Sequence, residues 1–277
     1  MQPVIKWTGS KRSQANELIK LFPKEMKTYY EPFCGGASVL RTLLDNMQEF
    51  VVERFVCCDI DKNLIGLWNA IKDCPSKIIE DYTSMWSKLN SRESVEERWK
   101  IFEDVRARLN IQHDPSDFMF ITRTATNGMT RYNAKGEFNN SFHFSRTGMK
   151  PETLKKIVYD WSNVLNKHDV KFELKDYLEL EPKAGDFCYL DPPYYNTKSV
   201  YQGRFDNNKL FEWLRNLQCG YVWSYNGISG NEDNTVKISK DLYDKHIYLK
   251  SGNSSFKRVA GKDNDAMVYE SVYIKSA

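Results

Sequence analysis

Short apolar runs rich in β-branched and aromatic residues alternate along this chain with longer stretches of helical periodicity. The six runs are residues 28–31, 55–58, 170–174, 187–190, 221–225 and 246–249, and the helical patterns cover about residues 11–21, 37–47, 62–72, 151–165 and 207–217. Such alternation predicts an α/β fold with helices on both faces of a mainly parallel sheet. A closing run, residues 266–274, alternates apolar and polar side chains, as an antiparallel edge strand would. We therefore expect a doubly wound, mainly parallel, seven-stranded sheet.

The second and third runs are separated by more than a hundred residues, which is far longer than an ordinary connection between neighbouring strands. This stretch contains a charged helical pattern at residues 94–109 and a turn-rich segment at 127–138. Within that segment, Ala134-Lys135-Gly136 is typical of the tip of a β-hairpin. We expect residues 1–70 and 155–277 to form one domain, with residues 71–154 inserted as a second, helical and hairpin-containing domain.

The composition narrows the class of protein. Hydrophobic residues make up 41% and charged residues 28%, as in a globular protein rather than a disordered or membrane protein. No apolar stretch has the length of a signal peptide or membrane span, so we expect a cytoplasmic protein that does not bind membranes. The six cysteines form no CxxC pair and the four histidines lack metal-site spacing, which favours reduced thiols and predicts no metal site. A net charge of +3 permits nucleic-acid binding without arguing for it.

A glycine pair marks a candidate ligand site. The segment Glu31-Pro32-Phe33-Cys34-Gly35-Gly36 lies between a predicted strand and a predicted helix, where α/β sheets bind ligands. Taken alone, it fits an ordinary tight turn equally well. Asp59 ends the next predicted strand about 20 residues later, the usual place of a carboxylate that binds ribose hydroxyls. The glycine spacing is not GxGxxG, which favours a nucleoside over a dinucleotide. For Asp61 we favour a helix-capping role before Lys62.

A second loop, Asp191-Pro192-Pro193-Tyr194, follows the buried run at residues 187–190. Two prolines fix two φ angles and remove two backbone donors, so the loop is stiff. It would present a carboxylate, the Pro192 carbonyl and the aromatic face of Tyr194 at the ligand edge of the sheet. The lone pair of an exocyclic amine is delocalised into its ring. If Asp191 and Pro192 accept the two amine hydrogens of adenine, they favour a pyramidal nitrogen that can attack a methyl donor, with Tyr194 stacked on an extruded base.

Five motifs in this order carry a family resemblance. The chain resembles the Dam-like, D12-class (group alpha) DNA adenine N6-methyltransferases over nearly its full length. The matching segments are Lys6-Trp7-Thr8-Gly9-Ser10-Lys11, Glu31-Pro32-Phe33-Cys34-Gly35-Gly36, Asp59-Ile60-Asp61, Arg131-Tyr132-Asn133 and Asp191-Pro192-Pro193-Tyr194. The resemblance implies a Rossmann-like methyltransferase fold, S-adenosylmethionine as methyl donor without a metal, and double-stranded DNA as substrate. It also leaves room for a cognate restriction enzyme as a partner, and implies a location in the cytoplasm on the nucleoid.

The resemblance also implies roles for individual residues. The catalytic residues would be Asp191, Pro192 and Tyr194. The residues that bind the cofactor would be Trp7, Lys11, Phe33, Gly35, Gly36, Asp59, Ile60, Asp176, Tyr177 and Asp191. Among these, Asp176 and Tyr177 resemble the acidic and aromatic pair that binds the adenine of the cofactor.

DNA recognition is expected in the inserted region, where cations alternate with aromatic residues that can contact phosphates and bases. The expected DNA-binding residues are Lys6, Arg123, Asn127, Met129, Arg131 and Asn133. By resemblance, Arg131 reads a base, Lys6 touches a flanking base, and Asn127 and Met129 fill the space beside the extruded adenine. Thr126 and Ser141 differ from the aromatic residue and the proline that are common in the family, so the resemblance implies a GATC-like site without fixing its sequence.

Three other functions remain open at the level of sequence. The first is N4 methylation of cytosine, because the same chemistry serves any exocyclic amine. Methylation of RNA or of a protein glutamine is another, although glutamine-modifying relatives usually carry asparagine where Asp191 stands. The third is a catalytically silent DNA-binding regulator on the same fold, against which the intact acidic, proline and tyrosine positions argue.

Overall fold

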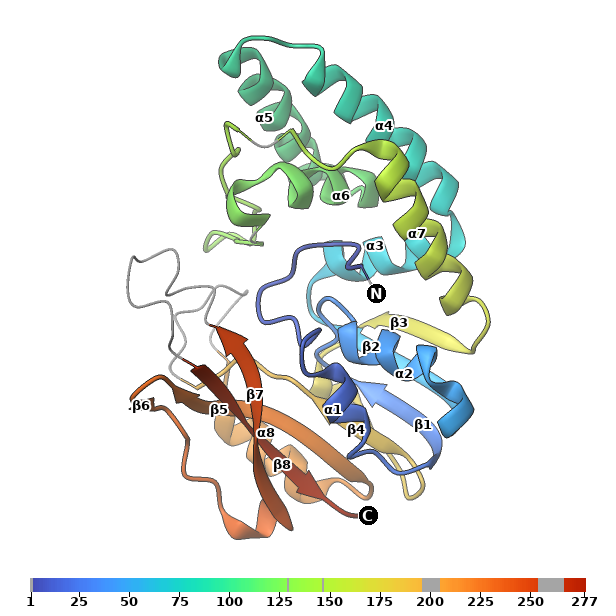
Figure 1. Ribbon diagram of the computed structural model, residues 1–277, viewed down its shortest axis with the longest axis vertical. Helices are drawn as coiled ribbons and strands as arrows, with labels where there is room; N and C mark the ends of the chain where they lie inside the picture. Colours follow the sequence, from blue (N-terminus) through green and yellow to red (C-terminus); the bar gives the residue numbers. More distant parts are fainter. Residues whose placement is uncertain (1, 129, 146, 196–204, 254–266) are drawn as a thin grey trace. The chain divides into compact units, whose positions relative to one another are not determined.

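The chain folds into two compact units, each assembled from separate segments of sequence. The computed structural model describes residues 2–128, 130–145, 147–195, 205–253 and 267–277, with only the backbone described at Asn127, Gly252 and Asn253 (Figure 1). Among these, the first unit comprises residues within 1–10 and 59–174. The second comprises residues within 11–58, 175–198 and 205–277.

The second unit contains a sheet with a parallel and an antiparallel part (Figure 1). Its strands are β1 (Glu25–Glu31), β2 (Val51–Asp59), β4 (Phe187–Leu190), β5 (Gly220–Ser229), β6 (Glu232–Asp233), β7 (Lys245–Asn253) and β8 (Met267–Lys275). They follow the order β2-β1-β4-β5-β8-β7, with β6 paired to β5. β1 runs parallel to β2 and β4, and β4 runs parallel to β5, whereas β8 is antiparallel to β5 and β7. The fold is therefore mixed α/β, as predicted.

Two expectations about the sheet were wrong. The closing run forms β8, but β8 lies between β5 and β7 rather than at an edge. Alternating polar and apolar side chains report which faces of a strand are buried, not whether its backbone is paired on one side or both. The described residues also contain eight strands where seven were expected, and the additional strand is the two-residue β6.

The second unit also contains helices. They are α1 (Ala15–Ile19), α2 (Ser38–Asp45), α8 (Asn207–Asn216) and the short 3-10 helices η1 (Met47–Glu49), η3 (Tyr177–Glu179) and η4 (Lys240–Leu242). The side chain of Asp206 accepts from the backbone N–H groups of Asn208 and Lys209 in the first turn of α8, which is a favoured way to begin a helix. Leu210 and Leu214 of α8 are buried in one core cluster with Trp223 and Tyr273, so α8 is held by its apolar face.

The first unit is mainly helical. It contains α3 (Lys62–Asp73), α4 (Pro75–Asn90), α5 (Val95–Gln112), α6 (Pro115–Thr124), the 3-10 helix η2 (Thr126–Gly128), α7 (Pro151–Leu165) and β3 (Val170–Leu174). Prolines occupy the first positions of α4, α6 and α7, where a missing N–H costs nothing. The helices α3 and α7 lie mostly outside residues 71–154 but belong to this unit, where α3 packs against α4 and α6, and α7 packs against α3 and α4. No helix among the described residues is both long and apolar enough to span a bilayer.

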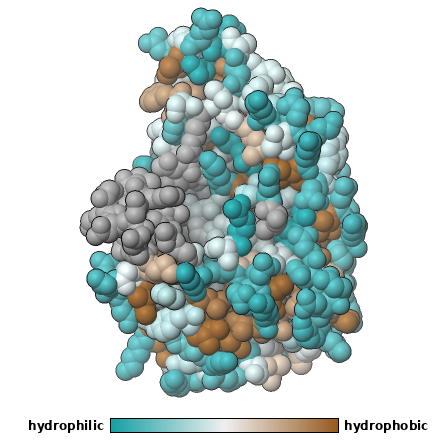
Figure 2. Space-filling view, in the orientation of Figure 1, coloured by the Kyte–Doolittle hydropathy of each residue, from teal (hydrophilic) through white to brown (hydrophobic). Residues whose placement is uncertain are grey.

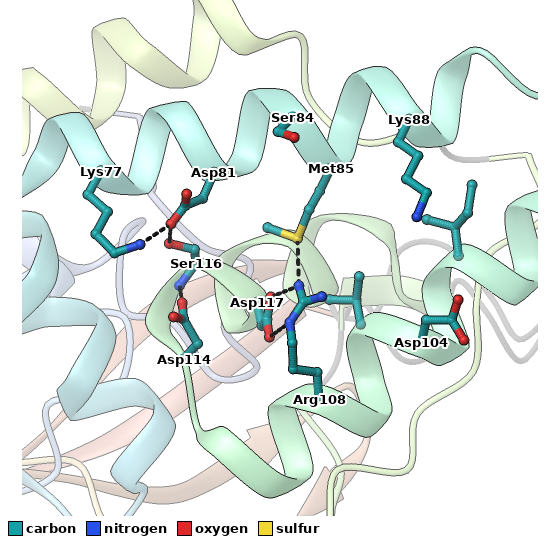
Figure 3. A pocket seen from close by; sticks show the side chains of 12 residues that line it. Lys77, Asp81, Ser84, Met85, Lys88, Asp104, Arg108, Asp114, Ser116 and Asp117 are labelled. Carbon is teal, nitrogen blue, oxygen red and sulfur yellow. Dashed lines mark hydrogen bonds and ion pairs between the residues drawn. The ribbon is translucent and has the colours of Figure 1, made fainter.

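A polar cavity of about 400 Å³ lies among α4, α5 and α6 (Figure 3). Arg108 Nε donates to Asp117 Oδ2 at 2.7 Å, and Ser116 Oγ donates to Asp81 Oδ2 at 2.8 Å. Because these carboxylates are paired by neighbouring side chains, we interpret the cavity as part of the helix packing. On the face seen in Figure 2, hydrophilic side chains cover most of the described surface and hydrophobic ones form small groups.

Candidate active site

The loop Asp191-Pro192-Pro193-Tyr194 leaves the carboxyl end of β4 in the second unit. β4 is entirely buried, and its register pairs Cys188 with Tyr30 of β1 on one side and with Tyr221 of β5 on the other. Since these strands are parallel, their carboxyl ends share one edge of the sheet. The sequence therefore predicted correctly that the loop begins at the edge where α/β sheets bind ligands.

A buried ammonium group binds Asp191. Lys11 Nζ lies 2.7 Å from Oδ1 and 2.8 Å from Oδ2 of Asp191, so it contacts both carboxylate oxygens. The same nitrogen lies 3.6 Å from Glu270 Oε2 on β8. The Lys11 side chain is only 4% exposed. Burial alone would lower the pKa of Lys11, but the charges of Asp191 and Glu270 outweigh it and raise the pKa, so this lysine stays protonated.

The carboxyl group of Asp191 is poised to titrate near neutral pH. Burial raises the pKa of Asp191 to about 6, against the opposing charge of Lys11, and the charge of Glu270 raises it further. Such a group is ionised at pH 7 yet keeps a basicity suited to accepting hydrogen bonds from an amine. Sequence reasoning missed Glu270, because its nearness to Lys11 depends on the pairing of β8.

Contacts to Tyr194 and to the following residue, Tyr195, fix the end of the loop. The Lys11 ammonium lies 5.1 Å from the centroid of the Tyr194 ring, and that ring packs edge-on against Tyr225 at 5.9 Å. Asn226 of β5 then clamps the next residue, because its Oδ1 accepts from Tyr195 N at 2.7 Å and its Nδ2 donates to Tyr195 O at 3.0 Å. The aromatic ring of the loop is thus held by Lys11 and Tyr225 before any substrate arrives.

The glycine turn follows β1, as predicted. Cys34 N donates to Cys58 O at 2.9 Å, which ties the turn to the end of β2. Gly35 has φ 44°, a left-handed conformation that suits glycine, and the turn leads into α2. Below it, Glu31 is buried and accepts from Tyr29 Oη at 2.7 Å. Burial raises the pKa of Glu31 to about 8, and the hydrogen bond from Tyr29 opposes the rise only in part.

An aromatic group lies beside this turn. Phe33 and Tyr177 have ring centroids 5.3 Å apart, and Phe205 lies 5.9 Å from Phe33 and 5.8 Å from Tyr177. Asp176 begins η3 through a capping box with Glu179, which fixes the residue before Tyr177. Sequence reasoning predicted Phe33, Asp176 and Tyr177 but missed Phe205.

Asp59 ends β2 and is also the first residue of the 59–174 segment of the first unit, where its Oδ1 accepts from Asp61 N at 3.1 Å. Ile60 is 49% exposed, and Trp7 is half-buried. Asp61 caps α3 as predicted, since its side chain accepts from the N–H groups of Asn63 and Leu64. The described part of the chain contains no cluster of His, Cys, Asp and Glu that could hold a metal ion.

The expected DNA-binding residues differ in their surroundings. Lys6 and Arg131 are exposed, and Asn133 forms a turn in which its Oδ1 accepts from Lys135 N at 2.9 Å. A side chain at Gly128 would collide with Lys6, whose Cδ would lie 2.7 Å from the added carbon. Met129 lies outside the described residues, as does the side chain of Asn127.

Arg123 has a different environment from the one expected. It is 8% exposed, and its Nη2 donates to the carbonyls of Pro3, at 2.9 Å, and of Val4. Burial lowers the pKa of Arg123 to about 10. In this position the guanidinium binds the backbone of residues 3–4, so we assign Arg123 a structural role in place of the expected contact with DNA. An arginine among aromatic residues looks the same in sequence whether it points inward or outward.

The loop at this edge of the sheet carries the carboxylate and the aromatic ring that the sequence analysis expected of a methyltransferase acting on amino groups. The model of the D12 class N6 adenine-specific DNA methyltransferase family matches residues 7–259. The chain therefore belongs to this family, and it is a DNA adenine methyltransferase.

Named relatives agree with this assignment. The chain is 29% identical over 213 residues to the type II methyltransferase M.MjaIII of Methanocaldococcus jannaschii, covering 70% of this chain and 69% of that protein. It is 30% identical over 199 residues to the type II methyltransferase M.CviBI of Paramecium bursaria Chlorella virus NC1A, with 70% and 69% covered. A DNA adenine methylase of Haemophilus influenzae is 30% identical over 155 residues, with 54% and 50% covered.

Proposed function

We propose that this protein transfers a methyl group from S-adenosylmethionine to the N6 amine of an adenine extruded from duplex DNA. The observation that carries the proposal is the ion pair between buried Lys11 and partly buried Asp191, the first residue of the Asp-Pro-Pro-Tyr loop. We infer that Asp191, Pro192 and Tyr194 are the catalytic residues.

The chemistry assigned to each catalytic residue follows from its surroundings. Lys11 stabilises the ionised form of Asp191, whose carboxylate oxygens have further lone pairs and accept one hydrogen of the adenine amine. The Pro192 carbonyl accepts the other, and Tyr194 offers its ring face to the base. These contacts localise the nitrogen lone pair, so that a new bond from nitrogen to the methyl carbon would form while the bond from that carbon to sulfur breaks and its electron pair stays on sulfur. The proton released from the nitrogen would pass to Asp191 or to water. The bound cofactor supplies an electrophilic methyl group carried on a positively charged sulfur.

The residues present fit this cofactor. The rings of Phe33 and Tyr177 offer apolar faces to a purine, and the opposite charges of Lys11 and Asp191 suit the amino-acid end. We propose that Asp59 accepts hydrogen bonds from the ribose and that Asp176 binds the adenine amine. The other proposed contacts are Trp7, Gly35, Gly36 and Ile60, to which we add Phe205 from its place in the aromatic group.

For DNA, we propose that Arg131 reads a base of a GATC-like site and that Lys6 contacts a flanking base. Both side chains are exposed, as such contacts require. Asn127, Met129 and Asn133 are retained as proposed contacts. We also propose that the first unit recognises the target and that the sheet of the second unit is the Rossmann-like catalytic core. A cognate restriction enzyme is retained as a proposed partner.

The test compares Asp191→Asn with Asp244→Asn. Both aspartates bind a lysine, but Asp244 is exposed and pairs with Lys275 at 3.0 Å. We expect Asp191→Asn to lower the rate of N6-methyladenine formation by about a hundredfold or more, and Asp244→Asn to leave it unchanged. Nucleoside analysis of methylated DNA identifies the product, and sequencing of modified adenines gives the site. Formation of N4-methylcytosine, or no methylated adenine from the wild-type protein on varied duplexes, would refute the proposal.

A further inference from the structure

Residues 131–139 form a hairpin that carries Arg131, and α5 of the same unit fixes this hairpin at its base. Asn139 N donates to Arg131 O, and Asn133 N donates to Glu137 O, both at 2.9 Å. Asn110 of α5 binds both backbone groups of Phe138, accepting from its N–H at 2.7 Å and donating to its carbonyl at 3.1 Å. The backbone on either side of Arg131 is thus held in place, so small displacements at its contacts reach the arginine.

Tyr132, the neighbour of Arg131, turns inward rather than toward solvent. Its hydroxyl donates to Asp61 Oδ2 at 2.7 Å and accepts from Asn63 Nδ2 at 3.1 Å. Its ring packs edge-on against Phe138, with centroids 5.8 Å apart. His113 Nδ1 lies 3.0 Å from Asn63 Oδ1, which completes a continuous network of polar side chains.

Asp61 is the junction of this network. One carboxylate oxygen, Oδ1, caps α3 by accepting from Asn63 N at 2.9 Å and Leu64 N at 3.2 Å. The other accepts from Tyr132, and the backbone N–H of Asp61 donates to Asp59 Oδ1. Asp61 is only 7% exposed, so the loss of one donor would leave a buried acceptor unsatisfied. A short chain of hydrogen bonds therefore runs from Asp59, through Asp61, to the hairpin.

We propose that Tyr132 is a positioning residue which couples cofactor binding at Asp59 to DNA binding at Arg131. This inference rests on the proposed function, in which those two residues contact the two substrates. A cofactor bound to Asp59 fixes the carboxylate that receives the Asp61 N–H. Asp61 then holds Tyr132, and the hairpin is ordered for DNA before the duplex binds. Each ligand thereby increases the affinity for the other by the same factor.

The test removes one hydroxyl. The dissociation constant of a target duplex is measured with and without saturating S-adenosylhomocysteine, which carries no transferable methyl group, and the ratio of the two values is the coupling factor. We expect a coupling factor above about 5 for the wild-type protein and within about twofold of unity for Tyr132→Phe. A wild-type factor near unity, or an unchanged factor in Tyr132→Phe, would overturn the proposal.

Tyr82→Phe is the matched control. Tyr82 lies in the same unit, and its hydroxyl also makes two hydrogen bonds, donating to Met149 O and accepting from Met149 N, both at 2.8 Å. It should lower stability by a similar amount while keeping the wild-type coupling factor, so an equal loss of coupling would overturn the proposal in favour of general loosening.

Two further variants separate this inference from the proposed function. Asp59→Ala should weaken cofactor binding in the absence of DNA, and Arg131→Ala should weaken preference for the target site. If either variant leaves its own ligand unaffected, the residue assignment fails and the coupling proposal fails with it. If both variants behave as expected while Tyr132→Phe keeps the wild-type coupling factor, only the coupling proposal is refuted.

Discussion

Replacement of Glu270 by glutamine tests the electrostatics around Asp191. Both carboxylates contact the ammonium of Lys11, at 2.7 Å and 3.6 Å, so their oxygens lie within about 6 Å of one another. At an effective dielectric constant of about 20, two like charges at that distance repel by about 3 kcal/mol, and the intervening lysine reduces this. We therefore expect Glu270→Gln to lower the pKa of Asp191 by about one unit, which corresponds to about 1.4 kcal/mol.

This shift predicts a gain of activity in acid. With a pKa of about 6, the fraction of Asp191 that is ionised at pH 5.5 is about one quarter. A pKa lower by one unit raises this ionised fraction to about three quarters, so kcat/KM of the variant at pH 5.5 should be about threefold above that of the wild type. Near pH 8, where Asp191 is ionised in both proteins, the two values of kcat/KM should be equal. The assay is kcat/KM for DNA methylation between pH 5 and pH 8.5. Glu232→Gln, which alters an exposed glutamate on β6, should leave the profile unchanged.

A merely structural role for Glu270 predicts something different. Damage to the packing of β8 would lower activity at every pH and would leave the midpoint of the acid limb in place. An unshifted midpoint, or a shift toward higher pH, would show that Glu270 does not act on Asp191 through its charge.

Two other predictions follow from buried polar groups. The pKa of Glu31 is about 8 in the folded protein and about 4.5 in the unfolded chain. Between these pH values the unfolded state binds fewer protons than the folded state, so the free energy of unfolding falls as pH rises. Glu31→Gln should shrink the loss of melting temperature between pH 5 and pH 8, and an undiminished loss would contradict the assigned pKa. Asn226→Asp keeps the acceptor for Tyr195 N but places a carboxylate against Tyr195 O, so single-turnover methylation should slow about tenfold with cofactor affinity retained. An unchanged rate would show that this clamp does not position the loop.

The parallel part of the sheet was predictable because its strands are short, apolar and bounded by turn residues. β4 and the loop at Asp191 illustrate this, since a fully buried strand followed by two prolines allows few other structures. The cap at Asp61 was predictable for the same reason, because its hydrogen bonds are made to residues two and three positions later.

Features that depend on distant segments were not predictable. The sequence around Arg123 suggested DNA contact, whereas the carbonyls that bind it belong to Pro3 and Val4. The place of Glu270 beside Lys11 requires β8 to pair on both sides. α6 escaped prediction because nearly all of its residues are buried, Phe118 among them, so it has no polar face to mark its period. α4, by contrast, has one apolar face with Ile78 and Tyr82, and the sequence analysis missed it.

The strand order also constrains how the chain acquires its structure during synthesis. β1 pairs with β2, its neighbour in sequence, but its other edge pairs with β4, where Tyr29 lies opposite Phe187. Residues 59–174, most of the first unit, must therefore leave the ribosome before that edge is covered. Pairing between distant strands is slow, and uncovered strand edges invite association with other chains. We expect the nascent protein to be most prone to aggregation in this interval.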